Sequence, residues 1–338
     1  MSTILVWGAG AIGGTVGAHL ARAGLDVLFV DRAADHVARI NEAGLRIVGP
    51  VREFTVPGRA VVPHDVQGRF KTVLLCVKAQ DTDDAARAIA PHLADDGCIV
   101  SVQNGLNELV IAEVVGGART VGAFVNFGAD YMEPGVVMYG GRGAVVVGET
   151  DGRVTPRAEK LHEMLQRFDD RAVLTTNIWG YLWAKLAYGA MLFATALTNE
   201  SMADCFASHA HRPLFTALAR EILGVAERAG IKPEPFDGFD PSAYGSDEGA
   251  QHSLDALEDH NRRSAKSHSG IWRDIAVRHR KTEADPQLGP IVTTAQRLGG
   301  DAPITARLIA MIHEIEDGRR KMAWANLDEL ARVAQPLT

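Results

Sequence analysis

The chain has 338 residues and a formal net charge of −7, and 23% of its residues are charged. This length is enough for two domains with cores of their own. Because no block of lysine or arginine stands out, we expect no nucleic-acid partner. The sequence shows neither a signal-peptide pattern nor an apolar run of membrane-spanning length, so we expect a cytoplasmic protein with no membrane partner. Three scattered cysteines, Cys76, Cys98 and Cys205, predict neither a disulfide framework nor a metal site.

The first half of the sequence alternates apolar runs with helical patterns. The expected strands are 4–7, 27–30, 73–77 and 99–102. The expected helices are 11–23, 35–43 and 82–93. Such strand–helix–strand units pair their strands in parallel, so we predict an α/β fold with a Rossmann-type doubly wound parallel sheet. Residues 121–147 predict further strands and hairpins at the sheet edge, and residues 1–176 form the expected dinucleotide-binding domain.

Helical periodicity dominates the sequence after Asn177. The expected helices are 179–196, 213–229, 288–298 and 304–317. A stretch rich in proline, glycine and aspartate, 233–249, predicts a long loop. We therefore predict that residues 177–338 form a mostly helical domain for substrate binding and dimerisation.

A glycine-rich motif, Gly8-Ala9-Gly10-Ala11-Ile12-Gly13, follows the first strand and opens the first helix. In this context Gly8 permits the tight turn, Gly10 lets a pyrophosphate approach the backbone, and Gly13 lets the helix pack on the strand. The free N–H groups at the helix start, around Ala11 and Ile12, are suited to phosphate. The motif predicts a dinucleotide site.

The end of the second strand, Val30-Asp31-Arg32, should select the cofactor. A carboxylate at Asp31 accepts hydrogen bonds from the adenosine ribose hydroxyls and repels a 2′-phosphate, which favours NAD(H). Arg32 offers the alternative, because its guanidinium can pair with the 2′-phosphate of NADP(H) or stack on adenine.

Three further patches carry candidate site residues. Lys78 and Asn104 each follow a predicted parallel strand, so both should lie at the carboxyl edge of the sheet. The alternatives are a surface lysine and an ordinary Asn-Gly turn. Lys185 lies on a helix that is apolar around most of its circumference. A lysine in such a position is paired or functional, and burial would lower its pKa into a useful range.

The glycine motif, these three patches and the stretch 269–283 occur in an order that resembles the ketopantoate reductase (2-dehydropantoate 2-reductase) family over nearly the whole chain. The resemblance implies that Lys185 protonates the substrate carbonyl oxygen and that Glu283 orients the substrate or tunes the lysine. It implies that Asn104 lies beside the nicotinamide and its ribose, that Lys78 contacts the cofactor, and that Ser269 binds substrate. The alternative for Glu283 is a helix cap or a salt bridge at a helix start.

The sequence also departs from the family pattern. The family often has asparagines four and eight residues after the catalytic lysine, where this chain has Gly189 and Phe193. Two polar contacts to substrate are thereby lost and an aromatic ring, Phe193, is gained, so substrate choice should change. The family is usually described as using NADPH, with a basic residue after the second strand, whereas Asp31 comes first here.

The resemblance predicts an NAD(P)-dependent homodimer that reduces a small 2-oxo acid to a 2-hydroxy acid, or runs the reverse reaction. Two alternatives stay open. One is a D-2-hydroxyacid dehydrogenase of other or broad specificity. The other is a non-catalytic protein that senses NAD(P).

Overall fold

The computed structural model describes residues 2–263 and 266–334. The chain divides into two compact units, Met1–Ile178 (unit 1) and Trp179–Thr338 (unit 2). Each helix within the described residues is too short or too polar to cross a lipid bilayer.

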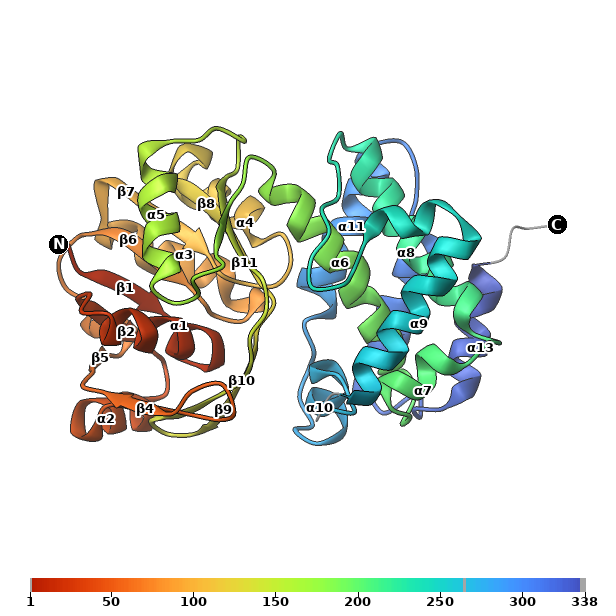
Figure 1. Cartoon of the computed structure of the whole chain (residues 1–338), viewed down its shortest axis with the longest axis horizontal. Helices are drawn as coiled ribbons and strands as arrows, with labels where there is room; N and C mark the ends of the chain where they lie inside the picture. Colours follow the sequence, from red (N-terminus) through yellow and green to blue (C-terminus); the bar gives the residue numbers. More distant parts are fainter. Residues whose placement is uncertain (1, 264–265, 335–338) are drawn as a thin grey trace. The chain divides into compact units, whose positions relative to one another are not determined.

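Unit 1 is built on an eight-stranded sheet in the order β12-β11-β8-β7-β6-β1-β2-β5. Figure 1 labels most of these strands. The strands are β1 (Ile4–Trp7), β2 (Val27–Val30), β5 (Arg59–Val61), β6 (Phe70–Leu75), β7 (Leu93–Ser101), β8 (Thr120–Val125), β11 (Val145–Glu149) and β12 (Val173–Leu174). Neighbouring strands are parallel except β8 and β11. The run β5-β2-β1-β6-β7-β8 is the doubly wound order of dinucleotide-binding folds. This confirms the predicted fold class.

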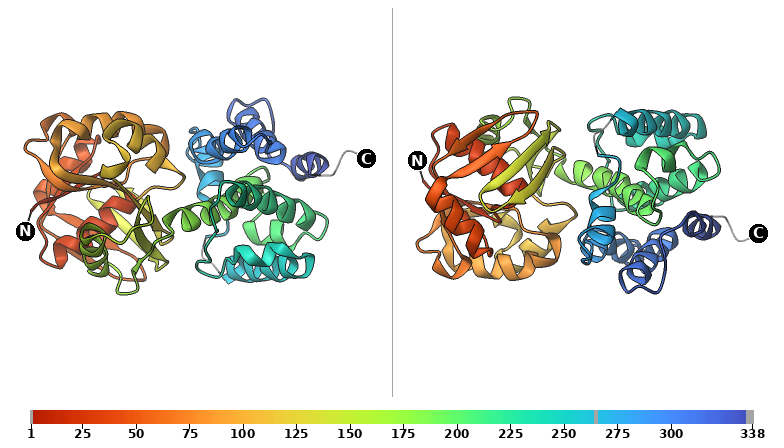
Figure 2. Two further views of the ribbon diagram at one scale, coloured as in Figure 1. Left: turned by 90° about the horizontal axis from the view of Figure 1, so that it is seen from above. Right: turned by 90° about the horizontal axis from the view of Figure 1, so that it is seen from below.

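Helices cover both faces of this sheet (Figure 2). They are α1 (Ala11–Arg22), α2 (Ala34–Ala43), α3 (Thr82–Ile89), α4 (Asn107–Val115) and α5 (Pro156–Gln166), with short 3-10 turns η1 (Pro63–Asp65), η2 (Ala79–Asp81), η3 (Ala90–His92) and η4 (Gly117–Arg119). Successive side chains of a strand point to opposite faces. Val6 of β1 accordingly joins the core that contains α1 and α5, whereas Leu5 joins the core beneath α3.

A second, four-stranded sheet in the order β4-β3-β10-β9 lies against α1. Its strands are β3 (Leu45–Val48), β4 (Phe54–Val56), β9 (Gly128–Glu133) and β10 (Val136–Gly141). The sequence predicts hairpins at the edge of the main sheet for this part of the chain, but β9 and β10 leave that sheet. The physical reason is that β10 pairs in parallel with β3, which lies far away in the sequence. The periodicity of a strand does not reveal which distant strand it pairs with.

The regular secondary structure in the described part of unit 2 consists of helices. Its helices are α6 (Ile178–Thr195), α7 (Met202–Ala207), α8 (Arg212–Arg228), α9 (Asp247–Arg263), α10 (Gly270–Ala276), α11 (Ala284–Arg297), α12 (Pro303–Glu316) and α13 (Trp324–Val333), with the 3-10 turn η5 (Pro241–Gly245). The stretch 233–249, predicted as a loop, contains η5 and the first turn of α9. Helix α9, which the sequence analysis did not predict, is polar overall and buries only a narrow stripe that includes Ala250, Leu254 and Leu257.

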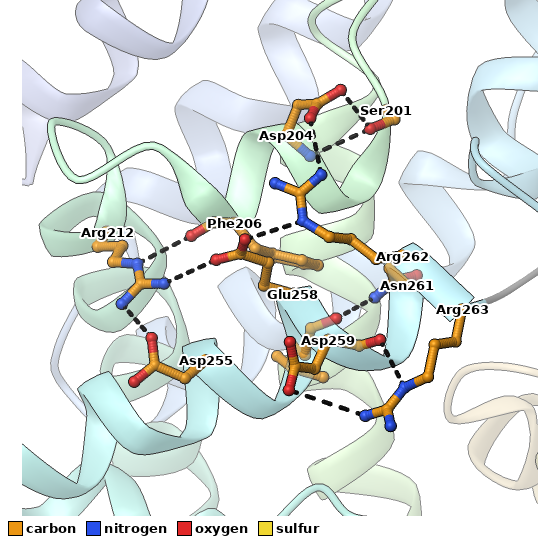
Figure 3. A network of polar contacts seen from close by, with 11 residues as sticks. Ser201, Asp204, Phe206, Arg212, Asp255, Glu258, Asp259, Asn261, Arg262 and Arg263 are labelled. Carbon is orange, nitrogen blue, oxygen red and sulfur yellow. Dashed lines mark hydrogen bonds and ion pairs between the residues drawn. The ribbon is translucent and has the colours of Figure 1, made fainter.

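One buried arginine anchors α9 to its neighbours (Figure 3). Arg212 is 5% exposed and donates hydrogen bonds to the Phe206 carbonyl (2.9 Å), to Asp255 (2.6 Å) and to Glu258 (3.1 Å). These partners belong to α7 and α9, and Gln251 of α9 accepts a further hydrogen bond (3.3 Å), so a single guanidinium joins three helices. The Arg212 side chain is only 6% exposed, so its charge depends on these partners, although the side chains of Asp255 and Glu258 are themselves 57% and 23% exposed.

A buried carboxyl lies at the start of α4. Glu108 is 1% exposed, and neither of its carboxyl oxygens has a hydrogen-bond partner within the described residues. Burial raises the pKa of Glu108 to about 8. The native state therefore favours the protonated acid near neutral pH.

This carboxyl should make stability depend on pH. From its ordinary pKa of 4.5 up to about 8, Glu108 keeps its proton in the native chain while the unfolded chain releases it, so the native state loses stability as pH rises through this window. The side chain of Glu108→Gln cannot ionise. The free energy of unfolding of this variant, relative to that of the wild type, should therefore be about 2–4 kcal/mol higher at pH 8 than at pH 5. Urea unfolding at both pH values measures this change. Glu113→Gln, at an exposed position of the same helix, is the matched control, and an equal gain at both pH values would contradict the assignment.

Candidate functional site

The glycine turn after β1 has a distinct steric requirement at each glycine. Gly8 has φ +98°, and a Cβ there would lie 2.9 Å from the Cys76 carbonyl carbon. A Cβ at Gly13 would lie 2.0 Å from the Gly8 carbonyl oxygen, so any side chain would force α1 away from the turn. At Gly10, in contrast, a Cβ would meet no described atom within 4 Å. Gly10 thus borders open space, as the close approach of a ligand to the backbone requires.

The start of α1 offers backbone donors to that space. Gly10 is the N-cap residue and provides no side-chain cap, and the first helical hydrogen bond runs from the Gly14 N–H to the Gly10 carbonyl (2.7 Å). The N–H groups of Ala11, Ile12 and Gly13 therefore have no acceptor within the helix. Three such donors at the positive end of a helix dipole suit a pyrophosphate.

Asp31 and Arg32 follow β2, the strand next to β1. Asp31 is half-buried, and its Oδ1 accepts a hydrogen bond from the Ala33 N–H (3.0 Å), which fixes the carboxylate at the turn. The Arg32 side chain is 80% exposed and its guanidinium pairs with Asp81 of η2 at 3.4 Å. The carboxylate is the better fixed of the two groups, because an exposed ion pair of this kind is weak.

Lys78 and Asn104 lie at the ends of the next two strands, β6 and β7. Both are exposed. A buried amide ties their loops together, since Gln103 donates to the Val77 carbonyl (3.0 Å) and to the Thr82 hydroxyl (2.8 Å). The carbonyl of Asn104 accepts from the Asn107 side chain (2.7 Å). Within unit 1, four neighbouring strands, β2, β1, β6 and β7, thus carry the candidate cofactor residues on the loops at their carboxyl ends.

Lys185 lies on α6 in unit 2. The partly exposed side chains of this helix form one stripe that contains Tyr181, Lys185, Tyr188 and Leu192, while most other positions are buried. Burial lowers the pKa of the Lys185 ammonium to about 8, and the charges of Asp237 and Glu283 oppose this fall. The structure thus brings the two predicted catalytic residues, Lys185 and Glu283, within electrostatic reach of each other.

The backbone holds Glu283 at the N-terminus of α11, and its side chain is 9% exposed. Its side chain makes no capping hydrogen bond to α11. Instead, the Thr282 hydroxyl accepts from the Ala284 N–H (3.3 Å), and the Thr282 N–H donates to Glu316 (2.7 Å). Neighbouring residues thus stabilise the helix start, and the Glu283 carboxylate is not used for capping.

Asp237 is a candidate that the sequence analysis missed. Phe236 and Phe239 exchange backbone hydrogen bonds (3.0 and 2.7 Å) around Asp237 and Gly238, whose φ values are +40° and +86°. Positive φ at both central residues is characteristic of a type I′ turn. The Asp-Gly pair between two phenylalanines was the signal available in the sequence. A non-glycine residue with positive φ is strained, and such strain is typical of functional sites.

The predicted substrate residues differ in their surroundings. Ser269 is 4% exposed and caps α10, where its hydroxyl accepts from the Trp272 N–H (3.1 Å). Gly189 lies one turn after Lys185, and a Cβ there would meet nothing within 4 Å. Phe193 is fully buried, with 0% of its surface exposed. Gly189 thus leaves room beside the lysine, whereas Phe193 packs in the interior.

The arrangement in unit 2 is suited to acid–base chemistry. A lysine with a pKa near 8 can give up or take a proton close to neutral pH, which is the range in which a general acid or base works best. Within residues 2–263 and 266–334, no group of three or more His, Cys, Asp or Glu side chains could hold a metal ion.

Comparisons with known proteins place this architecture in a family. Residues 4–152 match the family described as ketopantoate reductase PanE/ApbA, and residues 177–316 match its C-terminal domain. The 2-dehydropantoate 2-reductase of Archaeoglobus fulgidus is 29% identical over 93% of this chain and 98% of its own length. That of Pyrococcus abyssi is 28% identical over 91% of this chain and 96% of its own.

Solved structures agree with these sequence matches. A PanE/ApbA family ketopantoate reductase from Ralstonia eutropha JMP134 is 27% identical, with a TM-score of 0.79 over 94% of this chain and 99% of that chain. A D-mandelate dehydrogenase solved with NADH and anilino(oxo)acetate has the same fold, with a TM-score of 0.81, 22% identity and coverage of 94% and 99%. The two family matches cover most of the chain. The first contains the glycine turn, and the second contains Lys185 and Glu283. The chain therefore belongs to the ketopantoate reductase family of NAD(P)-dependent oxidoreductases.

Proposed function

We propose that this protein reduces a small 2-oxo acid to a 2-hydroxy acid, or catalyses the reverse reaction, with Lys185 as the proton donor or acceptor. The observation that carries the proposal is a half-buried lysine whose pKa falls to about 8 while two carboxylates, Asp237 and Glu283, oppose the fall. When bound, a nicotinamide cofactor supplies or accepts the hydride.

The side chains of the protein have separate roles in proton transfer and substrate binding. In the reducing direction, the Lys185 ammonium gives a proton to the carbonyl oxygen as negative charge develops on it. Glu283 and Asp237 keep the amine charged at neutral pH, because their charges counter its desolvation. Ser269, held at the start of α10, is the proposed partner of the substrate, since a hydroxyl that accepts a capping bond can still donate one.

We further propose that the cofactor is NAD(H) rather than NADP(H). Asp31 is held by the Ala33 N–H where the ribose hydroxyls of a bound adenosine are expected, whereas the exposed Arg32 is held only by a weak ion pair with Asp81. Lys78 and Asn104 are the proposed contacts to the rest of the cofactor. The division into a cofactor domain, 1–176, and a substrate and dimerisation domain, 177–338, the homodimer and the cytoplasmic location all stay predictions.

A D-2-hydroxyacid dehydrogenase of other or broad specificity is the second candidate, and Gly189 favours it. The family often has an asparagine at this position, and here the space beside the lysine is open. An oxo acid bulkier than ketopantoate would fill this space. Phe193 is fully buried, so its proposed influence on substrate choice would act through the packing of the interior.

The proton-transfer role makes a direct prediction for Lys185→Ala. Turnover should fall by about 10²–10⁴-fold, as expected for the loss of a positioned acid, while NADH affinity stays nearly constant. In the wild type, reduction should decline as pH rises through about 8, because the ammonium loses its proton, and oxidation should rise over the same range. Stopped-flow absorbance of the nicotinamide measures both directions. Lys321→Ala, at an exposed lysine of the same unit, is the control, and unchanged turnover of Lys185→Ala would remove this residue from the mechanism.

Substrate choice should respond to Gly189→Asn. The space at Gly189 admits a side chain, so the variant should fold normally and gain a polar contact beside Lys185. We expect kcat/KM for ketopantoate to rise relative to that for an aromatic 2-oxo acid such as benzoylformate by about tenfold. Steady-state kinetics on a panel of 2-oxo acids measures the ratio. A wild type that binds NADH but oxidises it with no member of the panel would instead favour the cofactor-sensing alternative.

Cofactor choice should respond to Asp31→Asn. Removing the negative charge at the end of β2 should shift the NADPH/NADH affinity ratio by about tenfold towards NADPH, because a 2′-phosphate is no longer repelled. Titration with both reduced cofactors, followed by nicotinamide fluorescence, measures the ratio. A wild type that already binds NADPH far better than NADH would refute the NAD assignment.

A further inference from the structure

A buried histidine joins the glycine turn to the β9–β10 hairpin. His36, on α2, is 0% exposed, and its Nδ1 accepts a hydrogen bond from the Gly135 N–H (2.9 Å) at the tip of the hairpin. Because Nδ1 is an acceptor, the proton of the neutral ring lies on Nε2, which donates to the Ala9 carbonyl (3.0 Å). One imidazole ring therefore fixes the hairpin relative to the turn that precedes α1.

This connection places Tyr131 beside the start of α1. Tyr131 of β9 lies opposite Val137 of β10, and a Cβ at Gly14 would lie 3.1 Å from the Val137 Cγ2. The Tyr131 ring also meets the His36 ring edge-on, with centroids 5.1 Å apart and planes at 67°. The aromatic side chain thus stands next to the first turn of the helix whose N–H groups are suited to phosphate.

The Tyr131 hydroxyl also lies within reach of the charge on Asp31. Burial raises the pKa of the phenol, and the carboxylates of Asp35 and Asp31 raise it further, with a smaller effect from Glu133. The residue nevertheless stays 39% exposed. A partly exposed phenol and the ribose-selecting carboxylate therefore face the same region, at the carboxyl end of β2.

We propose that Tyr131 is a further cofactor-binding residue, which packs its ring and directs its hydroxyl against the adenosine ribose and the adjoining phosphate, with His36 as the residue that positions it. The inference rests on the proposed dinucleotide site but not on hydride transfer. Its chemistry fits, because a tyrosine combines apolar area for a sugar face with a hydroxyl that can bond to a ribose hydroxyl or a phosphate oxygen. The β9–β10 hairpin then forms one wall of the adenosine site. The glycine motif alone does not predict this wall.

The test uses binding rather than catalysis. Dissociation constants for NADH and for ADP-ribose, which lacks the nicotinamide and cannot transfer hydride, are measured by titration calorimetry for wild type, Tyr131→Ala and Tyr131→Phe. We expect Tyr131→Ala to weaken both ligands by about tenfold or more and Tyr131→Phe to weaken both by about two- to tenfold. Met132→Ala, at the adjacent and 54% exposed position of β9, is the matched control and should leave both constants unchanged.

The outcomes separate this inference from the proposed function. Wild-type affinity of Tyr131→Ala for ADP-ribose, or an equal loss in Met132→Ala, overturns the role of Tyr131 while leaving the reductase proposal intact. A wild type that binds neither NADH nor ADP-ribose overturns both. Thermal unfolding of each variant checks that the fold is kept, and we expect unchanged midpoints because the side chain is partly exposed and lies at an edge strand.

Discussion

The close contact between α1 and β1 is the constraint on which the rest of unit 1 depends. Gly13 leaves no room for a side chain above the Gly8 carbonyl, so the helix starts directly at the end of the strand. This places the unpaired N–H groups of the helix start at the carboxyl edge of the parallel sheet, where the loops after the neighbouring strands also end. The same contact fixes the position of these N–H groups relative to Asp31 and to the loops that carry Lys78 and Asn104.

In unit 2, a balance of opposing electrostatic effects sets the pKa of Lys185. Desolvation disfavours the charged amine of Lys185, whereas the carboxylates of Asp237 and Glu283 favour it, and the outcome is a pKa of about 8. Both carboxylates depend on local backbone geometry, since Asp237 lies in a strained two-residue turn and Glu283 at the start of α11. The family fold supplies the scaffold, and these two short segments hold the carboxylates that limit the fall in the pKa of Lys185.

Local signals in the sequence predicted part of this structure well. Strands β1 and β2 coincide with the predicted runs, because buried parallel strands are continuously apolar, and Gly13 could be assigned from its place in the motif. Long-range features were missed. The pairing of β10 with β3 and the contact of Tyr131 with His36 join segments almost 100 residues apart, which no local pattern encodes. Asp237 was missed because its Asp-Gly turn lies in a stretch that predicted only a loop.

The central claim is that Lys185 exchanges the proton with the substrate. A crystal structure of the protein with NADH and an unreactive analogue of a 2-oxo acid tests it most directly. The account predicts that the Lys185 Nζ lies within hydrogen-bond distance, about 3 Å, of the oxygen that corresponds to the reacting carbonyl. An Nζ that points into solvent, with another side chain against that oxygen, would contradict the account.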